Sequence, residues 1–261
     1  MRSLWFRLKI MASAGAVLAL AAPPTAQAGE TIKLSSLSWP PYNGPELANG
    51  GSNTAKLRSF LKRAGYDLDV RFLPWKRAVK YGLERKEYLG YFPEYYREDK
   101  NCLWSKQFDT SVVGFVEAAS DSLSWSTVLP DLKSYDIGVV SGYANDNGPF
   151  DAAMNAGELN TQDVSKDLFN VKKVALGRID AAVIDKKVLQ HLLETKVPHL
   201  KDKVKFDETP LTKNGLFVCF QPDYPKAKEV RNALNAVIED RGVDDPEKKG
   251  SVSFLPSPDG A

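Results

Sequence analysis

Residues 31–72 read TIKLSSLSWPPYNGPELANGGSNTAKLRSFLKRAGYDLDVRF, and this stretch decides the fold. Thr31 to Leu37 has the composition of a strand, and Asp67 to Phe72 alternates apolar and polar residues as a second strand does. Between them, apolar residues recur at helical spacing from Leu57 to Ala64, and Gly65 is typical of a helix end. The stretch therefore predicts a strand-helix-strand unit, in which helices cover a parallel sheet.

The same alternation continues along the chain and then restarts. We expect a helix opening at Pro74-Trp75, a third strand at Leu89 to Phe92, and a second α/β unit after a crossing segment. Its expected elements and the last ones of the chain are strands at Ser111 to Ala118, Asp136 to Val140 and Ala181 to Ile184, a helix at Ser165 to Leu176, strands at Val204 to Phe206 and Leu216 to Phe220, and a helix from Pro225. This order predicts an α/β fold whose last elements return to the first unit.

The N-terminal residues predict export. Three basic residues precede an apolar run from Ile10 to Ala22, and Ala26-Gln27-Ala28 then has small residues at the spacing that a signal peptidase accepts. The run is shorter than the roughly 20 apolar residues that a membrane anchor needs. We therefore expect residues 1–28 to be a signal peptide and the mature protein to lie in the periplasm.

Composition excludes several classes of partner. The chain has 35 Lys and Arg against 33 Asp and Glu, and the expected signal peptide takes three basic residues and no acidic one, which leaves 32 against 33. A mature protein this close to neutral gives no reason to expect nucleic acid or an anionic membrane as partner. With only two Cys and two His, the chain predicts neither a metal site nor a cofactor.

Four motifs, in this order, carry a resemblance to a known family. They are Ser38-Trp39-Pro40-Pro41-Tyr42, Pro74-Trp75-Lys76-Arg77-Ala78, Gly90-Tyr91-Phe92-Pro93 and Gly177-Arg178-Ile179-Asp180-Ala181-Ala182-Val183. The set resembles the family 3 extracellular solute-binding proteins, the polar amino-acid receptors of ABC transporters, over nearly all of the mature chain.

The resemblance implies the type II periplasmic binding fold, in which two α/β lobes are joined by two crossover hinge strands and the ligand lies in the cleft. It implies that residues 29–114 and 207–261 form the first lobe and residues 115–206 the second. It also implies a monomer that captures a small polar solute, an amino acid or a related molecule, and delivers it to the membrane permease of an ABC importer. A ligand-sensing subunit for a signalling partner is the alternative.

Three aromatic residues are candidates for ligand contact in the first lobe. Trp39 and Tyr42 follow a predicted strand, where ligands of open α/β sheets bind, and a ring in a Pro-stiffened loop offers a rigid surface or a cation–π contact. Trp75 opens the next helix. The alternative for each is packing against its own lobe.

The family grips the ligand carboxylate with an arginine shortly before the first hinge. Arg97 has the chemistry for this role, because a guanidinium makes paired charge-assisted hydrogen bonds, but Lys100 is a second candidate for the position. Leu89 stands where the family usually has aspartate. An exposed loop charge is the alternative reading of Arg97.

The expected second lobe offers two further sites. Ser141, Gly142 and Tyr143 follow a strand and precede a helical segment, so their N–H groups are candidates for an anion-binding nest, or else an ordinary turn that runs into Asn145-Asp146-Asn147-Gly148. Asp185 matches the family carboxylate that receives the ligand ammonium, and it is equally a good helix N-cap.

The two cysteines, Cys102 and Cys219, are expected to pair, since the resemblance places both in the first lobe and the periplasm permits oxidation. Two buried free thiols are the alternative. No nucleophile elbow, P-loop or dinucleotide glycine pattern follows a strand, so we expect a binding protein and not an enzyme. A dehydratase-like activity on the same fold stays as the minor alternative.

Overall fold

The computed structural model describes residues 29–121, 129–240 and 252–253. The expected signal peptide, residues 1–28, lies outside these residues, and so does most of the tail that follows residue 240. Among the helices of the described part, none has the length and hydrophobicity that a membrane span requires.

The first lobe begins with the strand-helix-strand unit that the sequence predicts. Strands β1 and β2 pair in parallel along their whole length, and β1 also pairs in parallel with β3. Helix α1 buries Leu57, Phe60 and Leu61 as the helical spacing requires, and Gly65 follows its end with a φ of +91°, a conformation that glycine adopts without strain. The bounds are β1 Glu30–Ser36, α1 Ser52–Arg63, β2 Tyr66–Phe72, α2 Trp75–Glu84 and β3 Gly90–Glu94.

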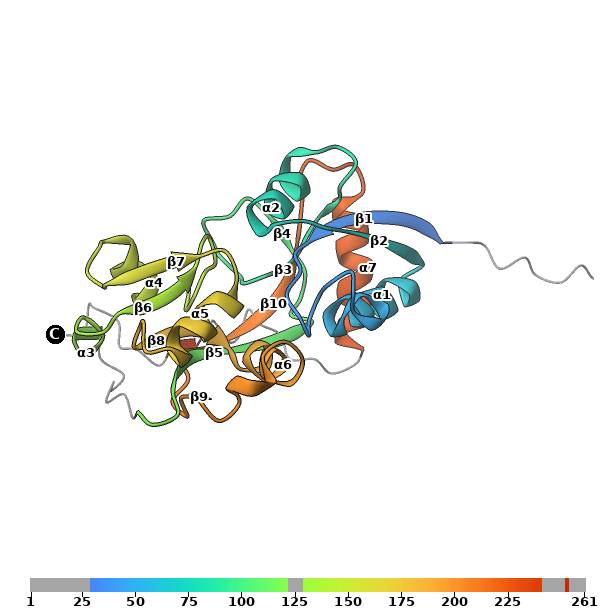
Figure 1. Cartoon of the computed structure of the whole chain (residues 1–261). Helices are drawn as coiled ribbons and strands as arrows, with labels where there is room; N and C mark the ends of the chain where they lie inside the picture. The colour runs from blue at the N-terminus through green and yellow to red at the C-terminus, as the bar shows by residue number, and fades with distance from the viewer. Residues whose placement is uncertain (1–28, 122–128, 241–251, 254–261) are drawn as a thin grey trace, which may run out of the picture.

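Two long antiparallel strands, β5 and β10, connect this lobe to the second one. The sheet runs in the order β2-β1-β3-β10-β5-β8-β6-β7, so these two strands occupy its middle. Figure 1 shows β1, β2, α1 and α7 gathered at one end of the molecule and β6, β7, α3 and α4 at the other. The bounds are β4 Leu103–Trp104, β5 Asp109–Ala118, α3 Leu129–Leu132, β6 Ile137–Val140, α4 Pro149–Asn155, β7 Thr161–Val164, α5 Asp167–Ala175, β8 Ala181–Asp185, α6 Lys186–Thr195, β9 Val204–Phe206, β10 Thr212–Phe220, α7 Ala227–Glu239 and β11 Val252–Ser253.

The last helix returns the chain to the first lobe, as the sequence predicts. Helix α7 contacts α1 and buries Val230, Leu234 and Ile238. A large hydrophobic cluster extends from this region through the sheet, and a smaller one around Phe115 and Phe150 lies in the second lobe. Each lobe thus has apolar side chains of its own to pack on its side of the sheet.

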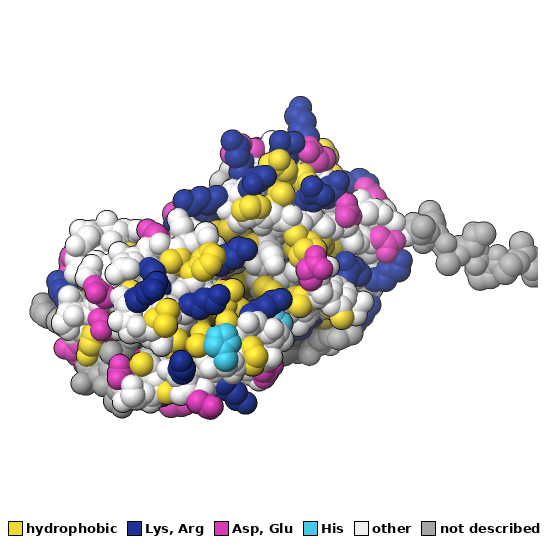
Figure 2. Space-filling view, in the orientation of Figure 1, with side chains coloured by type: hydrophobic (Ala, Val, Ile, Leu, Met, Phe, Trp, Pro, Cys, Tyr) yellow, Lys and Arg dark blue, Asp and Glu magenta, His cyan; other side chains and the backbone are white. Residues whose placement is uncertain are grey.

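The predicted strands and helices are all present, but the sequence pattern gave no range for several further elements, among them β4, α3, α4, β7 and α6, and it shortened β10. Strand β7 carries Gln162 and Asp163 and lies at the sheet edge, where a polar strand is tolerated, and α4 has only seven residues. Strand β10 begins at Thr212 and not at Leu216. The sequence pattern missed its first residues because Thr212 and Asn214 are polar, although both are buried. Charged residues are spread over the surface, with Lys and Arg interspersed among Asp and Glu on the face that Figure 2 shows.

Candidate functional site

A small cavity lies between the two lobes, where the carboxyl ends of β1, β3 and β6 meet. Its volume is about 50 Å³. The residues that line it come from both lobes and from β10: Leu37, Trp39, Trp75, Pro93, Glu94, Tyr95, Tyr143, Ala144 and Leu216. Ligands of open α/β sheets bind at this end of the strands, which makes the cavity the candidate ligand site.

Trp39 and Trp75, two of the three predicted aromatic contacts, line this cavity. Trp39 is held by a turn in which its N–H donates to the carbonyl of Asn43 at 2.8 Å. Tyr42 stacks on Trp39 with 4.4 Å between the ring centroids, but it is not among the lining residues. Trp75 packs edge-on against Tyr91 at the start of α2. Stacking therefore fixes both tryptophan rings at the edge of the cavity.

Asp185 ends β8 and is fully engaged by protein donors. Its carboxylate accepts hydrogen bonds from the Tyr42 hydroxyl at 3.0 Å, from the Ser111 hydroxyl at 2.6 Å and from the N–H groups of Val112, Lys187 and Val188. The last two bonds make it the N-cap of α6. Burial raises the pKa of this carboxyl, and the hydrogen bonds act in the opposite direction.

The bond from Tyr42 crosses between the lobes and belongs to a longer chain of hydroxyl groups. The Tyr95 hydroxyl lies 3.1 Å from the Ser111 hydroxyl. Because Ser111 has a single hydroxyl proton and donates it to Asp185, Tyr95 is the donor to Ser111. Tyr95, Ser111, Asp185 and Tyr42 thus form one buried network in which each hydroxyl proton has an acceptor.

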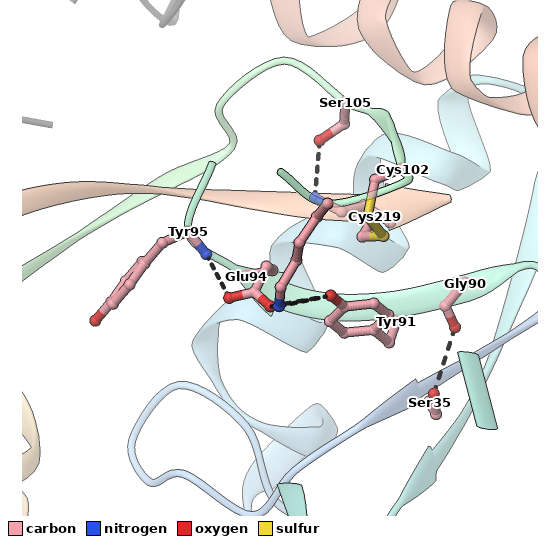
Figure 3. The surroundings of a disulfide bond; sticks show 10 residues. Ser35, Gly90, Tyr91, Glu94, Tyr95, Cys102, Ser105 and Cys219 are labelled. Atoms are coloured by element: carbon pink, nitrogen blue, oxygen red, sulfur yellow. Dashed lines mark hydrogen bonds and ion pairs between the residues drawn. A yellow bond between two sulfur atoms is a disulfide. The ribbon is translucent and has the colours of Figure 1, made fainter. Parts of the chain in front are cut away.

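Glu94 is a site residue that the sequence did not single out. It ends β3, is 6% exposed, and lines the cavity. Its carboxylate accepts from the Tyr91 hydroxyl at 2.9 Å and from the Tyr95 N–H at 3.0 Å, and it pairs with the ammonium of Lys100 (Figure 3). Its place directly after a predicted strand is the signal that identifies it, by the same criterion that selects Trp39.

Cys102 and Cys219 form a disulfide beside this cluster, with 5.2 Å between their Cα atoms (Figure 3). The bond links the segment before β4 to strand β10, across a sequence separation of 117 residues. It anchors the end of the segment that carries Arg97 and Lys100 to strand β10. The first-lobe side of the cavity is therefore fixed covalently as well as by the Glu94–Lys100 pair.

Neither of the two candidates for binding a ligand carboxylate is among the residues that line the small cavity. Lys100 pairs with Glu94, and Arg97 makes a bidentate pair with Asp99 at 2.9 and 2.6 Å. The hydrogen bonds to Asp99 raise the pKa of Arg97 further. Arg97 borders a second, polar cavity of about 570 Å³ that shares Tyr143 and Ala144 with the first.

Ser141, Gly142 and Tyr143 form a turn, and the helix expected directly after them begins only at Pro149. The N–H of Ser141 donates to Val164 and that of Tyr143 to Val140, so these two groups are not free for an anion. Asp146 accepts three N–H groups at the start of α4, which is the turn chemistry that the Asn-Asp-Asn-Gly run indicates. Tyr143 contributes its side chain to the small cavity, and Ser141 and Gly142 border the polar one.

Asp167 lies near the site and was also missed. It opens α5, where an acid at a helix N-terminus is favourable, and its side chain is half-buried. Burial and the charge of Asp185 raise the pKa of Asp167 to about 7. Burial and the charge of Asp167 raise the pKa of Tyr143 in turn. The sequence signal was an acid just inside the predicted helix that follows β7.

Among the described residues, no three His, Cys, Asp or Glu side chains lie close enough to hold a metal ion. The cavity and its surroundings offer aromatic surface, one acid paired with its cation, and a buried hydrogen-bond network.

Solved structures resemble this chain over most of its length. The GluR0 ligand-binding core from Nostoc punctiforme in complex with L-glutamate is 17% identical, with a TM-score of 0.62 over 80% of this chain and 94% of that chain. A histidine kinase sensor domain with similarity to periplasmic binding proteins is 14% identical, with a TM-score of 0.68 over 82% and 92%. The substrate-binding protein of an amino acid ABC transporter is 18% identical, with a TM-score of 0.61 over 81% and 93%.

These similarities confirm the fold that the resemblance implied: the chain has the two-lobed α/β fold of type II periplasmic binding proteins. No family model and no curated protein matches its sequence.

Proposed function

We propose that this chain is a periplasmic solute-binding protein that captures a small polar solute, an amino acid or a related molecule, for an ABC-type importer. The observation that carries the proposal is the cavity between the lobes, whose lining comes from both of them. A ligand in such a cavity is enclosed when the lobes approach and is released when they part.

The hinge of this movement is the pair β5 and β10. We place the lobe boundaries in or near these strands, with residues 29–114 and 207–261 in one lobe and 115–206 in the other. The bond between Tyr42 and Asp185 joins the lobes and favours the closed form. Trp39 and Trp75 supply the rigid surface against which the solute packs.

The export signal predicted at residues 1–28 supports a periplasmic location. The amino acid ABC transporter protein among the structural neighbours supports the transport role. A monomer that presents its closed form to a permease is the simplest arrangement for this role.

A second candidate function is ligand sensing for a signalling partner, which the likeness to the histidine kinase sensor domain favours. Neighbouring permease and ATPase genes support transport, whereas a neighbouring kinase gene supports sensing. An enzyme on this fold, such as one with dehydratase-like activity, is separated from both by recovering the ligand after incubation, because a binding protein returns it unchanged.

Native mass spectrometry of the freshly purified protein tests capture directly, because a co-purified solute adds its mass. A thermal-shift screen of amino acids, polyamines, quaternary ammonium compounds and organic acids follows, since a ligand that binds only the folded state raises the melting temperature.

Binding should also change the tryptophan fluorescence. Trp75→Phe should reduce that change, whereas Trp104→Phe, which alters a ring that packs on Phe217 outside the cavity, should retain it. The absence of any bound mass and of any shift across the screen would count against the proposal.

A further inference from the structure

We propose that the small cavity takes the methylated ammonium head of a cationic ligand and not the primary ammonium of an α-amino acid. The inference rests on the proposed function and names the ligand class for the same site. The inference is based on the lining of the cavity, which has four aromatic side chains, Trp39, Trp75, Tyr95 and Tyr143, and Glu94 as its charged residue.

The lining offers aromatic surface and few hydrogen-bond acceptors. The other lining residues are Leu37, Pro93, Ala144 and Leu216, which are apolar. Tryptophan is a donor only, so the side-chain acceptors of the lining are two tyrosine hydroxyl oxygens and the Glu94 carboxylate. That carboxylate already receives the Tyr91 hydroxyl, the Tyr95 N–H and the Lys100 ammonium. A primary ammonium brings three N–H donors that each need an acceptor, whereas a quaternary ammonium brings none. Attraction to aromatic faces therefore suits the methylated head.

Asp185, the carboxylate that the sequence analysis assigned to a ligand ammonium, is already occupied. Asp185 is 3% exposed, does not line the cavity, and accepts five hydrogen bonds from protein groups. An ionised carboxylate has about four lone-pair positions, so five donors leave no place for the ligand. A ligand ammonium in this site would have to displace Tyr42 or Ser111.

The charges around the cavity favour a cation over an anion. Among the described residues that line it, Glu94 alone is charged, and Asp185 and Asp167 lie behind the second-lobe side. Burial raises the pKa of both Tyr95 and Tyr143, and nearby charges add to it: those of Asp185 and Glu94 at Tyr95, and that of Asp167 at Tyr143. Negative charge therefore lies near both sides of the cavity, and only on the first-lobe side is it balanced by a paired cation. Lys100, the nearby cation, is held by Glu94.

The test compares two compounds of the same shape in calorimetric titrations. Choline carries a trimethylammonium, and 3,3-dimethyl-1-butanol replaces its charged nitrogen by carbon. Choline should bind at least about tenfold more tightly, the scale of a cation–π contribution in a desolvated site. Equal binding of the two compounds would overturn the inference, because it would assign the affinity to apolar burial alone.

A variant pair assigns the effect to the aromatic lining. Trp75→Leu should weaken choline by about tenfold or more and leave 3,3-dimethyl-1-butanol nearly unchanged. Tyr81→Leu is the matched control, since Tyr81 is an aromatic residue on the same helix that packs near Tyr88 and Arg85 and is not among the lining residues. An equal loss of choline affinity in both variants would contradict the assignment of binding to the aromatic lining of the cavity.

L-arginine and L-glutamate separate this inference from the proposed function. If either binds tightly while choline, glycine betaine and tetramethylammonium do not, the ligand class is wrong and solute capture stands. If none of the five compounds binds the purified protein and native mass spectrometry finds no other bound solute, both fail. Binding of the methylated compounds with no binding of the two amino acids is the expected result.

Discussion

The two sides of the small cavity hold their negative charge in different ways. On the first-lobe side, Glu94 is paired with the cation Lys100, and the disulfide fixes the loop that carries Lys100. On the second-lobe side, every hydrogen bond to Asp185 given by the described residues comes from a neutral hydroxyl or N–H group. Asp167 lies nearby with a raised pKa. On the first-lobe side the carboxylate is thus balanced by a cation, and a disulfide anchors the segment of that cation. On the second-lobe side the carboxylate has only neutral hydrogen-bond donors.

Because of this difference, we expect the two sides of the cavity to change differently when the lobes move apart. The Glu94–Lys100 pair and the disulfide lie within the first lobe and persist when the lobes part. Asp185 would lose its bond from Tyr42, because that donor lies on the loop after β1, whereas Ser111 and Val112 lie on the hinge strand β5, which pairs with β8. A bound cation would offset the negative charge on the second-lobe side and favour closure, which links ligand charge to the movement.

The largest effect is expected from the covalent part of the first-lobe side. Replacing both cysteines, in Cys102→Ala with Cys219→Ala, should lower the free energy of unfolding by up to about 4–5 kcal/mol, because the bond closes a loop of more than 100 residues in the unfolded chain. Urea denaturation measures the loss. Reductant should destabilise the natural protein by a similar amount and leave the double variant unchanged.

Two results would contradict this assignment. One is labelling of both thiols in the unfolded, non-reduced protein, which would mean that the cysteines are free. The other is an unchanged denaturation midpoint in the double variant, which would mean that the first-lobe side does not depend on its covalent link.

The next effect concerns the dipole-held carboxylate of the second-lobe side. Asp185→Ala removes the N-cap of α6 and leaves the hydroxyls of Tyr42 and Ser111 without their acceptor, so the free energy of unfolding should fall by about 2–4 kcal/mol. Asp185→Asn keeps one acceptor oxygen and should lose about half as much. Thermal or urea denaturation of the unliganded protein gives both values.

Asp180→Ala is the matched control for this series. Asp180 precedes the same strand at its opposite end, is exposed, and accepts a hydrogen bond from the N–H of Asp136 at 2.7 Å. Its loss should cost about 1 kcal/mol or less. Equal losses for Asp180→Ala and Asp185→Ala would show that the inter-lobe network adds nothing to stability.

Local periodicity predicted the elements that pack by repeating apolar residues. Leu57, Phe60 and Leu61 identify α1 because a helix buries residues at this spacing. Strand β7 was missed because Gln162 and Asp163 at a sheet edge carry no such pattern. The fold could therefore be predicted wherever burial is one-sided and repeats along the chain.

The site could be predicted only in part, because its contacts are long-range. Trp39 and Trp75 were found from their position after strands. The bond between Tyr42 and Asp185 joins residues 143 positions apart, and no local pattern encodes it. Glu94 was missed because a buried acid and an exposed one look alike in sequence, and its burial depends on Lys100 and the fold around it.

The smallest effect is a pH dependence on the second-lobe side. The folded state raises the pKa of Asp167 from 3.8 to about 7, so it binds a proton more tightly than the unfolded chain does. The associated stability is fully present below about pH 4 and is lost as the pH rises toward 7 and beyond. Asp167→Asn cannot ionise, so it should raise the free energy of unfolding by about 1–2 kcal/mol near pH 8, an amount that solvent screening of a half-buried group limits. At pH 4 the variant and the natural protein should differ little.

Urea denaturation at several pH values measures both free energies of unfolding. Asp163→Asn, which changes an exposed acid on the neighbouring strand β7, should leave the pH profile unchanged. A profile for Asp167→Asn that parallels that of the natural protein would mean that the charge of Asp167 is balanced after all, and the contrast between the two sides of the cavity would then rest on Asp185 alone.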